Sequence, residues 1–287
     1  MSVKILSALS LLALIAAVAQ PAEAWGREGH RAAATIAYGQ LTPKAKAAVD
    51  ALVPSMGTDF VSLSTWADDI RSQRRNTGGW HFVNAEDDPL NGKCGILNYP
   101  ADCPADGCVV AAIAKAAWPL PNIDIKMKAE ALAFILHFVG DVSQPLHASK
   151  YGRGSNDVKV IFDNDTKANL HAVWDGHIIR KTIATEYGND WNAWVNGLLA
   201  LPVKAEELVG VTCAKNVKGS NIDLVSACAV EWANDSEKHV CLSVYQPGFQ
   251  PNTQLGGAYY DAVKRAVDTQ VLKAGMRLGA FLNALFA

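Results

Sequence analysis

The sequence predicts a mainly α-helical fold built as a single domain. Alanine-rich or amphipathic stretches cover most of the chain, and only one short stretch alternates as a strand does. Side chains of the kinds that bind metals extend from position 30 to position 175 without an intervening linker, which favours one domain over two. The chain of 287 residues can bury a large core, and its net charge of −2 argues against a protein that binds nucleic acid mainly through a basic surface.

The first 24 residues predict a secretory signal peptide. Lys4 precedes an uncharged apolar run over 5–19, and Ala22-Glu23-Ala24 has the small-residue pattern of a cleavage site. The run is shorter than the roughly 20 residues that a membrane-spanning helix needs. We therefore expect residues 1–24 to be removed, leaving a soluble chain, secreted or periplasmic, that begins at Trp25 and forms one domain over 25–287.

The elements of this domain can be predicted in order along the chain. Thr42 followed by Pro43 is a typical helix start. Gly, Asn, Asp, Pro and Cys are concentrated in 76–104, which predicts a long loop, whereas 158–162 alternates and precedes Asp163-Asn164-Asp165, which predicts a small β-hairpin. The predicted helices are 28–40, 43–53, 62–73, 109–118, 125–143, 170–185, 191–201, 222–244 and 256–286.

Six cysteines in an exported chain predict three disulfide bonds. Fifteen pairings are possible, and Cys103 with Cys108 would form the easiest local loop. None of the spacings resembles a Cys-x-x-Cys metal site.

The strongest functional signal lies in the helix predicted over 125–143. His137 and Asp141 are four residues apart, so they lie on one helical face and can reach a common point. Pro145 should stop the helix at Gln144 and let His147 turn back toward them. Imidazole nitrogen together with carboxylate oxygen suits zinc.

The same spacing recurs downstream in His171 and Asp175, and two copies indicate a metal cluster more strongly than one. Three upstream residues, His30, Asp68 and His81, are further candidates. Taken singly, they are better explained as a helix-start histidine, a solvated helix acid and a loop histidine. Their order along the chain is what favours a ligand role.

In this order the motifs resemble those of the secreted zinc-dependent single-strand-specific nucleases with 3'-nucleotidase activity, which occur in fungi, plants and bacteria. The resemblance covers essentially the whole chain after residue 24. It implies a multi-helix bundle of a type shared with zinc phospholipases C. The motifs that carry it are Trp25-Gly26…Gly29-His30, Trp66-Ala67-Asp68…Arg71, His81-Phe82, His137-Phe138-Val139-Gly140-Asp141…Gln144-Pro145-Leu146-His147 and Asn169-Leu170-His171…Trp174-Asp175.

The resemblance implies three zinc ions per chain, two of them close together and sharing a carboxylate. The ligands of the first would be Asp68, His81, His137 and Asp141. Those of its neighbour would be His30, Asp141 and the amino nitrogen and carbonyl oxygen of Trp25. Those of the third would be His147, His171 and Asp175. Because Trp25 offers a free amine only after the signal peptide is removed, processing would be a condition for activity.

Such a cluster suits phosphodiester hydrolysis, because a zinc-bound water loses its proton near pH ~7 instead of ~16. The expected reaction is in-line attack on phosphorus by water between the paired ions, with the third zinc taking the leaving 3'-oxygen. Asp68, Asp141 and Arg71 would be the catalytic residues. Arg71 resembles the family's transition-state arginine, whose fork can pair with two phosphoryl oxygens.

Three further residues are implied to bind substrate. Phe82 matches the position where the family stacks a nucleobase, which tolerates any base but excludes one still paired in a duplex. Asn84 stands where some relatives carry aspartate, which leaves base preference open. Asn156, in Gly154-Ser155-Asn156, resembles a Gly-Gly-Asn segment near the family's phosphate site. The alternatives are an exposed cation at Arg71, a core phenylalanine and two turn asparagines.

Of the other polar and aromatic residues, some are expected to have no role in the chemistry, and for four cations a role is left open. Residues predicted to be structural are His177, His239, Trp191, Trp194 and Trp232. Four cations, Arg74, Arg75, Lys150 and Arg153, could either collect phosphates near the mouth of the site or only solvate the surface.

The resemblance also implies a disulfide pattern, in which Cys94 is bonded to Cys241, Cys103 to Cys108, and Cys213 to Cys228.

The leading hypothesis is a trinuclear zinc phosphodiesterase that cuts single-stranded DNA and RNA to 5'-phosphorylated products and removes 3'-phosphates from nucleotides, with no protein partner. A zinc phospholipase C is the enzymatic alternative, because the central motif alone does not separate the two; Asp68, Arg71 and His81-Phe82 favour the nuclease. A zinc-binding protein without catalysis is the third reading, although metal stores more often use flexible His-rich tracts.

Overall fold

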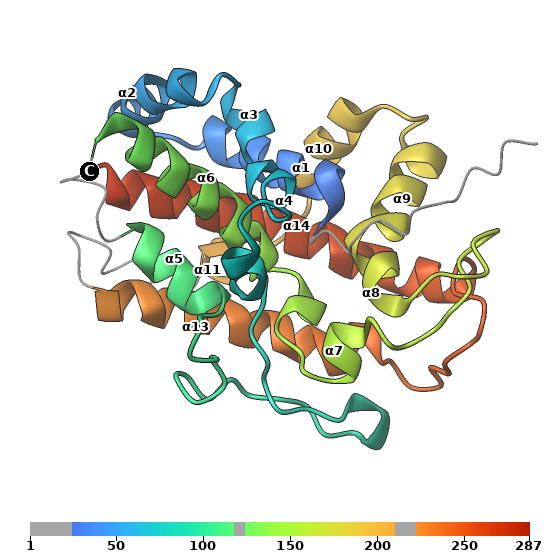
Figure 1. Ribbon diagram of the computed structural model, residues 1–287. Helices are drawn as coiled ribbons and strands as arrows, with labels where there is room; N and C mark the ends of the chain where they lie inside the picture. The colour runs from blue at the N-terminus through green and yellow to red at the C-terminus, as the bar shows by residue number, and fades with distance from the viewer. Residues whose placement is uncertain (1–24, 118–123, 210–221) are drawn as a thin grey trace, which may run out of the picture.

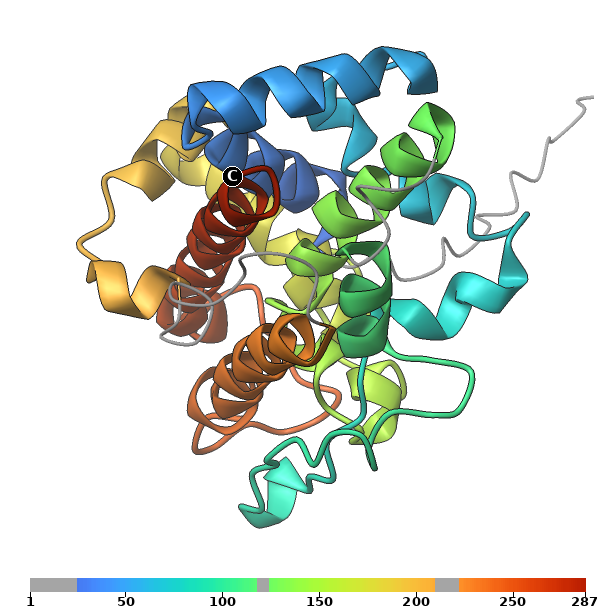
Figure 2. The same ribbon diagram turned by 90° about the vertical axis from the view of Figure 1, so that its left-hand side faces the viewer.

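A computed structural model describes residues 25–117, 124–209 and 222–287, so the predicted signal peptide lies outside the described residues. The described chain is mainly helical, as predicted (Figure 1). Its longest helix, α14 (Ala258–Leu285), runs across the middle of the molecule and packs against α1 (Gly26–Gly39) and α6 (Ile125–Asp141). On the other side, α13 (Ile222–His239) lies beside α14 and packs against α5 (Val109–Ala117), as Figure 2 shows.

Shorter elements surround this framework, and several begin with a side-chain cap. The hydroxyl of Thr42 accepts from the amide of Ala45, and the carboxylate of Asp124 accepts from two amides in the first turn of α6. The remaining elements are α2 (Pro43–Leu52), η1 (Val53–Met56), α3 (Phe60–Leu63), α4 (Trp66–Asp69), η2 (Arg75–His81), η3 (Pro89–Asn91), η4 (Pro145–His147), α7 (Gly152–Ser155), α8 (Leu170–Ala172), η5 (Val173–His177), α9 (Ile178–Glu186), α10 (Trp191–Leu199), α11 (Ala205–Val209) and η6 (Val240–Val244).

Two hydrophobic cores divide the molecule, and α1 lies between them. Ala34 and Ala37 of α1 belong to the core formed with α2, α5, α6 and α13. Ala32 and Ile36 belong to the second core, which is formed with η5, α9, α10 and the first half of α14. This division places His30 of α1, which is fully buried, between the two cores.

The prediction of one helix over 62–73 is wrong, because the structure has two short helices, α3 and α4, in this region. The hydroxyl of Ser64 donates to the carbonyl of Val61, and that of Thr65 donates to the carbonyl of Ser62. Such side-chain bonds compete with the helical pattern. The break leaves the carbonyl of Ser64 available to His137, whose Nδ1 lies 2.8 Å away.

Two other predicted helices are also interrupted, and the predicted hairpin is not confirmed. The helix over 170–185 contains a π-helical turn at η5, and that over 222–244 ends in a second one at η6. Around 158–162 the chain makes isolated bridges, Lys159 with Asn169, Phe162 with Asp165, and Ile161 with Gln254. Because these single bridges reach different partners on both sides, no continuous two-stranded ladder forms there.

The disulfide expectation holds where the structure describes both partners. Cys94 is bonded to Cys241, and Cys103 to Cys108. Cys228 is also disulfide-bonded, and its expected partner Cys213 lies outside the described residues. Among the described helices, none is both long and apolar enough to cross a membrane.

Candidate metal centre

The C-terminal end of α6 presents His137 and Asp141 toward one point, as their spacing predicts. Both are fully buried. The Nδ1–H of His137 is directed at the carbonyl of Ser64, which turns Nε2 toward Asp141. The helix stops at Asp141, and η4 brings His147 back to the same region after Pro145.

Four ligand atoms from three segments meet at this helix end. The Nδ1 atom of His81 lies 3.1 Å from Nε2 of His137, 3.0 Å from Oδ2 of Asp141 and 3.6 Å from Oδ1 of Asp68. Nε2 of His137 lies 3.4 Å from Oδ2 of Asp141 and 3.5 Å from Oδ1 of Asp68. A tetrahedral zinc with bonds of about 2.0–2.1 Å separates its ligand atoms by about 3.3–3.4 Å. These distances therefore fit a single ion.

Asp141 divides its two oxygens between neighbouring groups. Oδ2 faces His81 and His137, whereas Oδ1 lies 3.2 Å from Nε2 of His30. The ring of His30 stacks on that of His137 at 4.0 Å between centroids. A Cβ at Gly140 would lie 2.6 Å from Nδ1 of His30, so the absence of a side chain at this position lets the ring pack against α6. Asp141 thus presents one oxygen to His30 and the other to His81 and His137.

Trp25 lies at the start of α1, one turn before His30. Its carbonyl accepts from the amide of Gly29, and its indole is fully buried. A Cβ at Gly26 would lie 3.2 Å from the carbonyl oxygen of Asp175, so this end of α1 packs directly on η5. The end of α1 that carries Trp25 is therefore in contact with the element that carries Asp175.

A separate triad combines His147, His171 and Asp175, all buried. Nε2 of His171 lies 3.1 Å from Oδ2 of Asp175, and Nε2 of His147 lies 3.8 Å from Oδ1. The amide of Gln144 donates to Oδ1 of Asp175 at 2.5 Å. The backbone carbonyl of His81 accepts a hydrogen bond from Nδ1 of His147. The backbone carbonyl of Gly154 accepts one from Nδ1 of His171. The imidazoles are therefore held with Nε2 toward the carboxylate.

The donor set fits divalent cations better than a self-sufficient hydrogen-bond network. Buried atoms that lack a hydrogen-bond partner include His30 Nε2, His147 Nε2, Asp141 Oδ1 and Asp175 Oδ2. Buried polar atoms are normally satisfied, and the binding of an ion is one recognised reason for exceptions. Nitrogen and carboxylate oxygen in groups of three or four are the ligands that zinc takes in catalytic sites.

Burial and mutual charge set the protonation of these groups. Burial alone would raise the pKa of Asp68, but the neighbouring His137 outweighs it and lowers the value to about 2. Burial would lower the pKa of His137, but Asp141 and Asp68 raise it to about 9. Burial lowers the pKa of His147 to about 4. A cation bound at the first cluster must therefore displace a proton from His137, whereas His147 is already neutral at pH 7.

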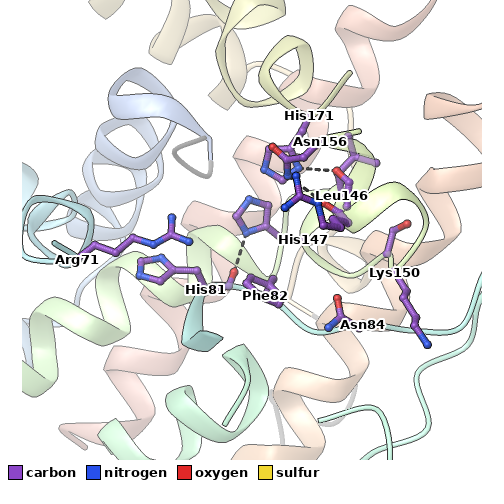
Figure 3. A pocket seen from close by; sticks show the side chains of 12 residues that line it. Arg71, His81, Phe82, Asn84, Leu146, His147, Lys150, Asn156 and His171 are labelled. Atoms are coloured by element: carbon purple, nitrogen blue, oxygen red, sulfur yellow. Dashed lines mark hydrogen bonds between the residues drawn. The ribbon is translucent and has the colours of Figure 1, made fainter. Parts of the chain in front are cut away.

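A cavity of about 580 Å³ opens beside both groups, within the roughly 300–1,000 Å³ range of ligand pockets. Figure 3 shows Arg71 extending toward His81, with Phe82 and His147 beyond it. Arg71 lies two residues after the end of α4, and its amide donates to the carbonyl of Asp68. The structure thus brings the predicted arginine to the same cavity as the predicted metal ligands.

The other predicted substrate residues line the same cavity. Phe82 is extended, with φ −149° and ψ 169°, so Phe82 and Asn84 lie on one side of the segment and the buried Val83 on the other. Asn156 follows α7 and donates through Nδ2 to the carbonyl of Arg153. Phe82 is therefore not a core phenylalanine, and both asparagines face the pocket.

Residues predicted to have no role in the chemistry lie elsewhere. His177 bonds to the carbonyl of Ala172 and to Asp165, and His239 contacts Ser243. Trp194 and Trp232 are fully buried, and Trp191 is partly buried. Of the four uncertain cations, Lys150 and Arg153 line the cavity and Arg74 and Arg75 do not.

Sequence reasoning missed three residues that support the ligands: Ser64, Gln144 and Gly140. Gln144 and Gly140 lie inside the central motif, so their place in it was the one available signal. Ser64 acts through its backbone carbonyl, and because every residue has one, the sequence does not indicate this role.

Residues 25–287 match the family model described as S1/P1 Nuclease. The chain is 32% identical to Nuclease PA3 of Penicillium sp and to Nuclease P1 of Penicillium citrinum, each over 91% of this chain and 97% of the relative. It is 29% identical to Nuclease S1 of Aspergillus oryzae over 96% of this chain and 97% of the relative.

Proposed function

Because the chain belongs to the S1/P1 nuclease family, we propose that it is a secreted, zinc-dependent phosphodiesterase. Its substrates would be single-stranded DNA and RNA, cut to 5'-phosphorylated products, and nucleotides bearing a 3'-phosphate. The observation that carries this proposal is that two groups of metal-ligand side chains, each containing a His-x-x-x-Asp pair, lie beside one cavity. His81, His147 and His171 of these groups line it together with Arg71 and Phe82.

Three zinc ions would be bound by the residues that converge in the two groups. The first ion would take Asp68, His81, His137 and Asp141, and the second would take His30, Asp141 and the amine and carbonyl of Trp25. The third would take His147, His171 and Asp175. When bound, such ions activate water at neutral pH and stabilise the charge on phosphoryl oxygens and on the leaving oxygen.

The chain's own residues would select and hold the substrate. The guanidinium of Arg71 would pair with two phosphoryl oxygens and stabilise their growing charge. Phe82 would stack on an unpaired base, and Asn84, two residues on, could donate to or accept from its edge. Asn156 would position the phosphate by donating the second N–H of its Nδ2, since only one N–H is used in the bond to the carbonyl of Arg153. Stacking of this kind requires a base released from a duplex.

Signal-peptide removal would complete the site. The family match begins at Trp25, the residue predicted to become the N-terminus, and this supports a division into a signal peptide over 1–24 and a nuclease domain over 25–287. The disulfide bonds are consistent with an exported protein.

The test combines metal analysis of the processed protein with parallel hydrolysis assays. We expect close to three zinc ions per chain, cleavage of single-stranded DNA and RNA well above that of duplex DNA, and loss of activity in chelator that returns with zinc. Phosphatidylcholine is the contrasting substrate. Phosphocholine release without nucleic acid cleavage would contradict the proposal, and full zinc loading without turnover on any substrate would indicate a binding protein.

A further inference from the structure

Two cations besides Arg71 line the cavity, Lys150 and Arg153. Figure 3 shows Arg71 and Lys150 at opposite sides, with His81 and Phe82 between them. Arg153 also lines the cavity, and its side chain is 77% exposed. The proposed function gives these two cations no role, although both line the same cavity as the metal ligands His81, His147 and His171.

Arg153 occupies an unusual backbone position. Four consecutive residues of α7, Gly152, Arg153, Gly154 and Ser155, have φ of 54°, 57°, 63° and 65°. This left-handed turn crowds the Cβ of an ordinary residue and suits glycine. At Gly154 a glycine is required, because a Cβ would lie 2.5 Å from the carbonyl oxygen of Leu146. A glycine at position 153 would be easier still, yet the chain has arginine there.

The side chain of Arg153 is held at the cavity by a carboxylate. Its Nε lies 3.2 and 3.0 Å from the two carboxylate oxygens of Asp157, and its Nη2 lies 2.9 Å from Oδ1. Both side chains are more than half exposed, so solvent screens the pair and makes it weak. The fork that accepts a carboxylate in this geometry also fits a phosphate, which carries more acceptor oxygens.

We propose that Arg153 is a binding residue for the phosphate of the nucleotide adjacent to the one being cleaved, and that this phosphate replaces Asp157 on its guanidinium. The inference rests on the proposed function and adds a subsite to it. The ligand is a single strand with at least two phosphates, one at the metal centre and one at Arg153. Strain is often retained at functional sites, which explains arginine between two glycines.

The test compares Arg153→Gly with the unsubstituted chain, both loaded with zinc, on two substrates. Thymidine 3'-monophosphate has one phosphate, and a short oligothymidylate has several. We expect KM for the oligothymidylate to rise about tenfold with kcat unchanged, and both constants for the mononucleotide to stay the same. The slope of log affinity against log salt for the oligothymidylate should become about 0.7 less steep, as for one lost single-strand phosphate contact. The Tm should not fall, because glycine suits this φ.

Two further variants sharpen the result. Asp157→Asn removes the competing carboxylate, so oligothymidylate should bind more tightly while the mononucleotide is unaffected. Arg265→Ala is the matched control, an exposed arginine on α14 that does not line the cavity, and it should change neither constant. If the loss of any positive charge weakened binding, KM for the oligothymidylate would instead rise in both Arg153→Gly and Arg265→Ala.

Equal losses on both substrates, or no loss on either, would overturn the subsite. Binding of a fluorescein-labelled oligothymidylate in chelator provides a readout without catalysis. If the unsubstituted chain hydrolyses neither substrate, the proposed function fails. The subsite is still supported if Arg153→Gly weakens binding in chelator and Arg265→Ala does not, and it is contradicted if the two variants bind alike.

Discussion

At the scale of single residues, the candidate centre depends on how one carboxylate is shared. Asp141 is fully buried and directs Oδ2 to His81 and His137 and Oδ1 to His30. Burial would raise the pKa of its carboxyl, but these histidines lower it well below its usual range. The carboxylate form of Asp141 is therefore favoured at neutral pH, and both of its oxygens are available to cations without a change of protonation.

Arg71→Ala should separate catalysis from metal binding. We expect kcat on single-stranded DNA to fall about 100- to 1,000-fold, because a preformed partner for the developing phosphoryl charge is lost. Zinc content should not change, since a guanidinium stays protonated and does not bind a cation. Arg75→Ala is the matched control, because Arg75 is exposed and does not line the cavity. Retained activity in Arg71→Ala would remove this residue from the reaction, and lost zinc would make its role structural.

Glu237 should make stability depend on pH. Its side chain is fully buried and accepts from the amide of Gly95, and burial together with the nearby Asp87 raises the pKa of its carboxyl to about 8. The folded state therefore holds a proton that the unfolded state loses above its ordinary pKa of about 4.5. The free energy of unfolding should fall by on the order of a few kcal/mol as pH rises from about 4.5 to about 8.

Glu237→Gln should remove this dependence, since the amide keeps the shape without titrating. Denaturant unfolding at several pH values measures it as the difference between the two proteins. Glu207→Gln, at an exposed position of α11, is the control and should follow the unsubstituted chain. A pH profile of Glu237→Gln parallel to that of the unsubstituted chain would show that Glu237 is ionised in the fold.

At the scale of elements, the sequence predicted the long helices well and their interruptions poorly. The spacing in α6 placed His137 and Asp141 correctly, because a 3.6-residue repeat fixes which side chains share a face. The breaks after α3 and within 170–185 arise from local hydroxyl bonds and a π-turn, which apolar periodicity does not register. Ligands have recognisable residue types, but the backbone carbonyls that orient them occur at every position, so Ser64 could not be predicted.

The contact between α1 and α6 gives a prediction at this scale. A methyl group at Gly140 would lie 2.6 Å from Nδ1 and 2.8 Å from Cε1 of His30, whose ring is fully enclosed. Gly140→Ala should therefore displace His30 and lower the zinc content by about one ion, even though alanine favours helix by about 1 kcal/mol. Gly39→Ala, where no atom lies within 4 Å of the added methyl, is the control. Unchanged zinc content in Gly140→Ala would show that His30 is not a ligand.

At the scale of the whole molecule, the candidate centre lies where separate parts of the chain meet. Its side chains come from α1, α4, η2, α6, η4, α8 and η5, and α1 joins the two hydrophobic cores. Such convergence could be anticipated only through the order of motifs, because periodicity does not say which distant segments touch. The same arrangement places the start of α1 against η5, which carries Asp175, so under the proposed function the position of the N-terminus would affect metal binding.

The last prediction concerns that N-terminus. Three forms should be prepared, the chain beginning at Trp25, the same chain with one extra alanine before Trp25, and the full 287-residue chain. If the free amine of Trp25 is a ligand, the first form should bind about three zinc ions and the others about two, because an amide nitrogen does not ligate in this way. Activity should fall at least tenfold in the extended forms while Tm in chelator is the same for the two short ones, which differ by a single residue. Adding zinc should raise Tm most in the form that begins at Trp25.

Equal zinc content in all three forms would contradict a ligand role for the amine of Trp25. Processing would then no longer be a condition for activity.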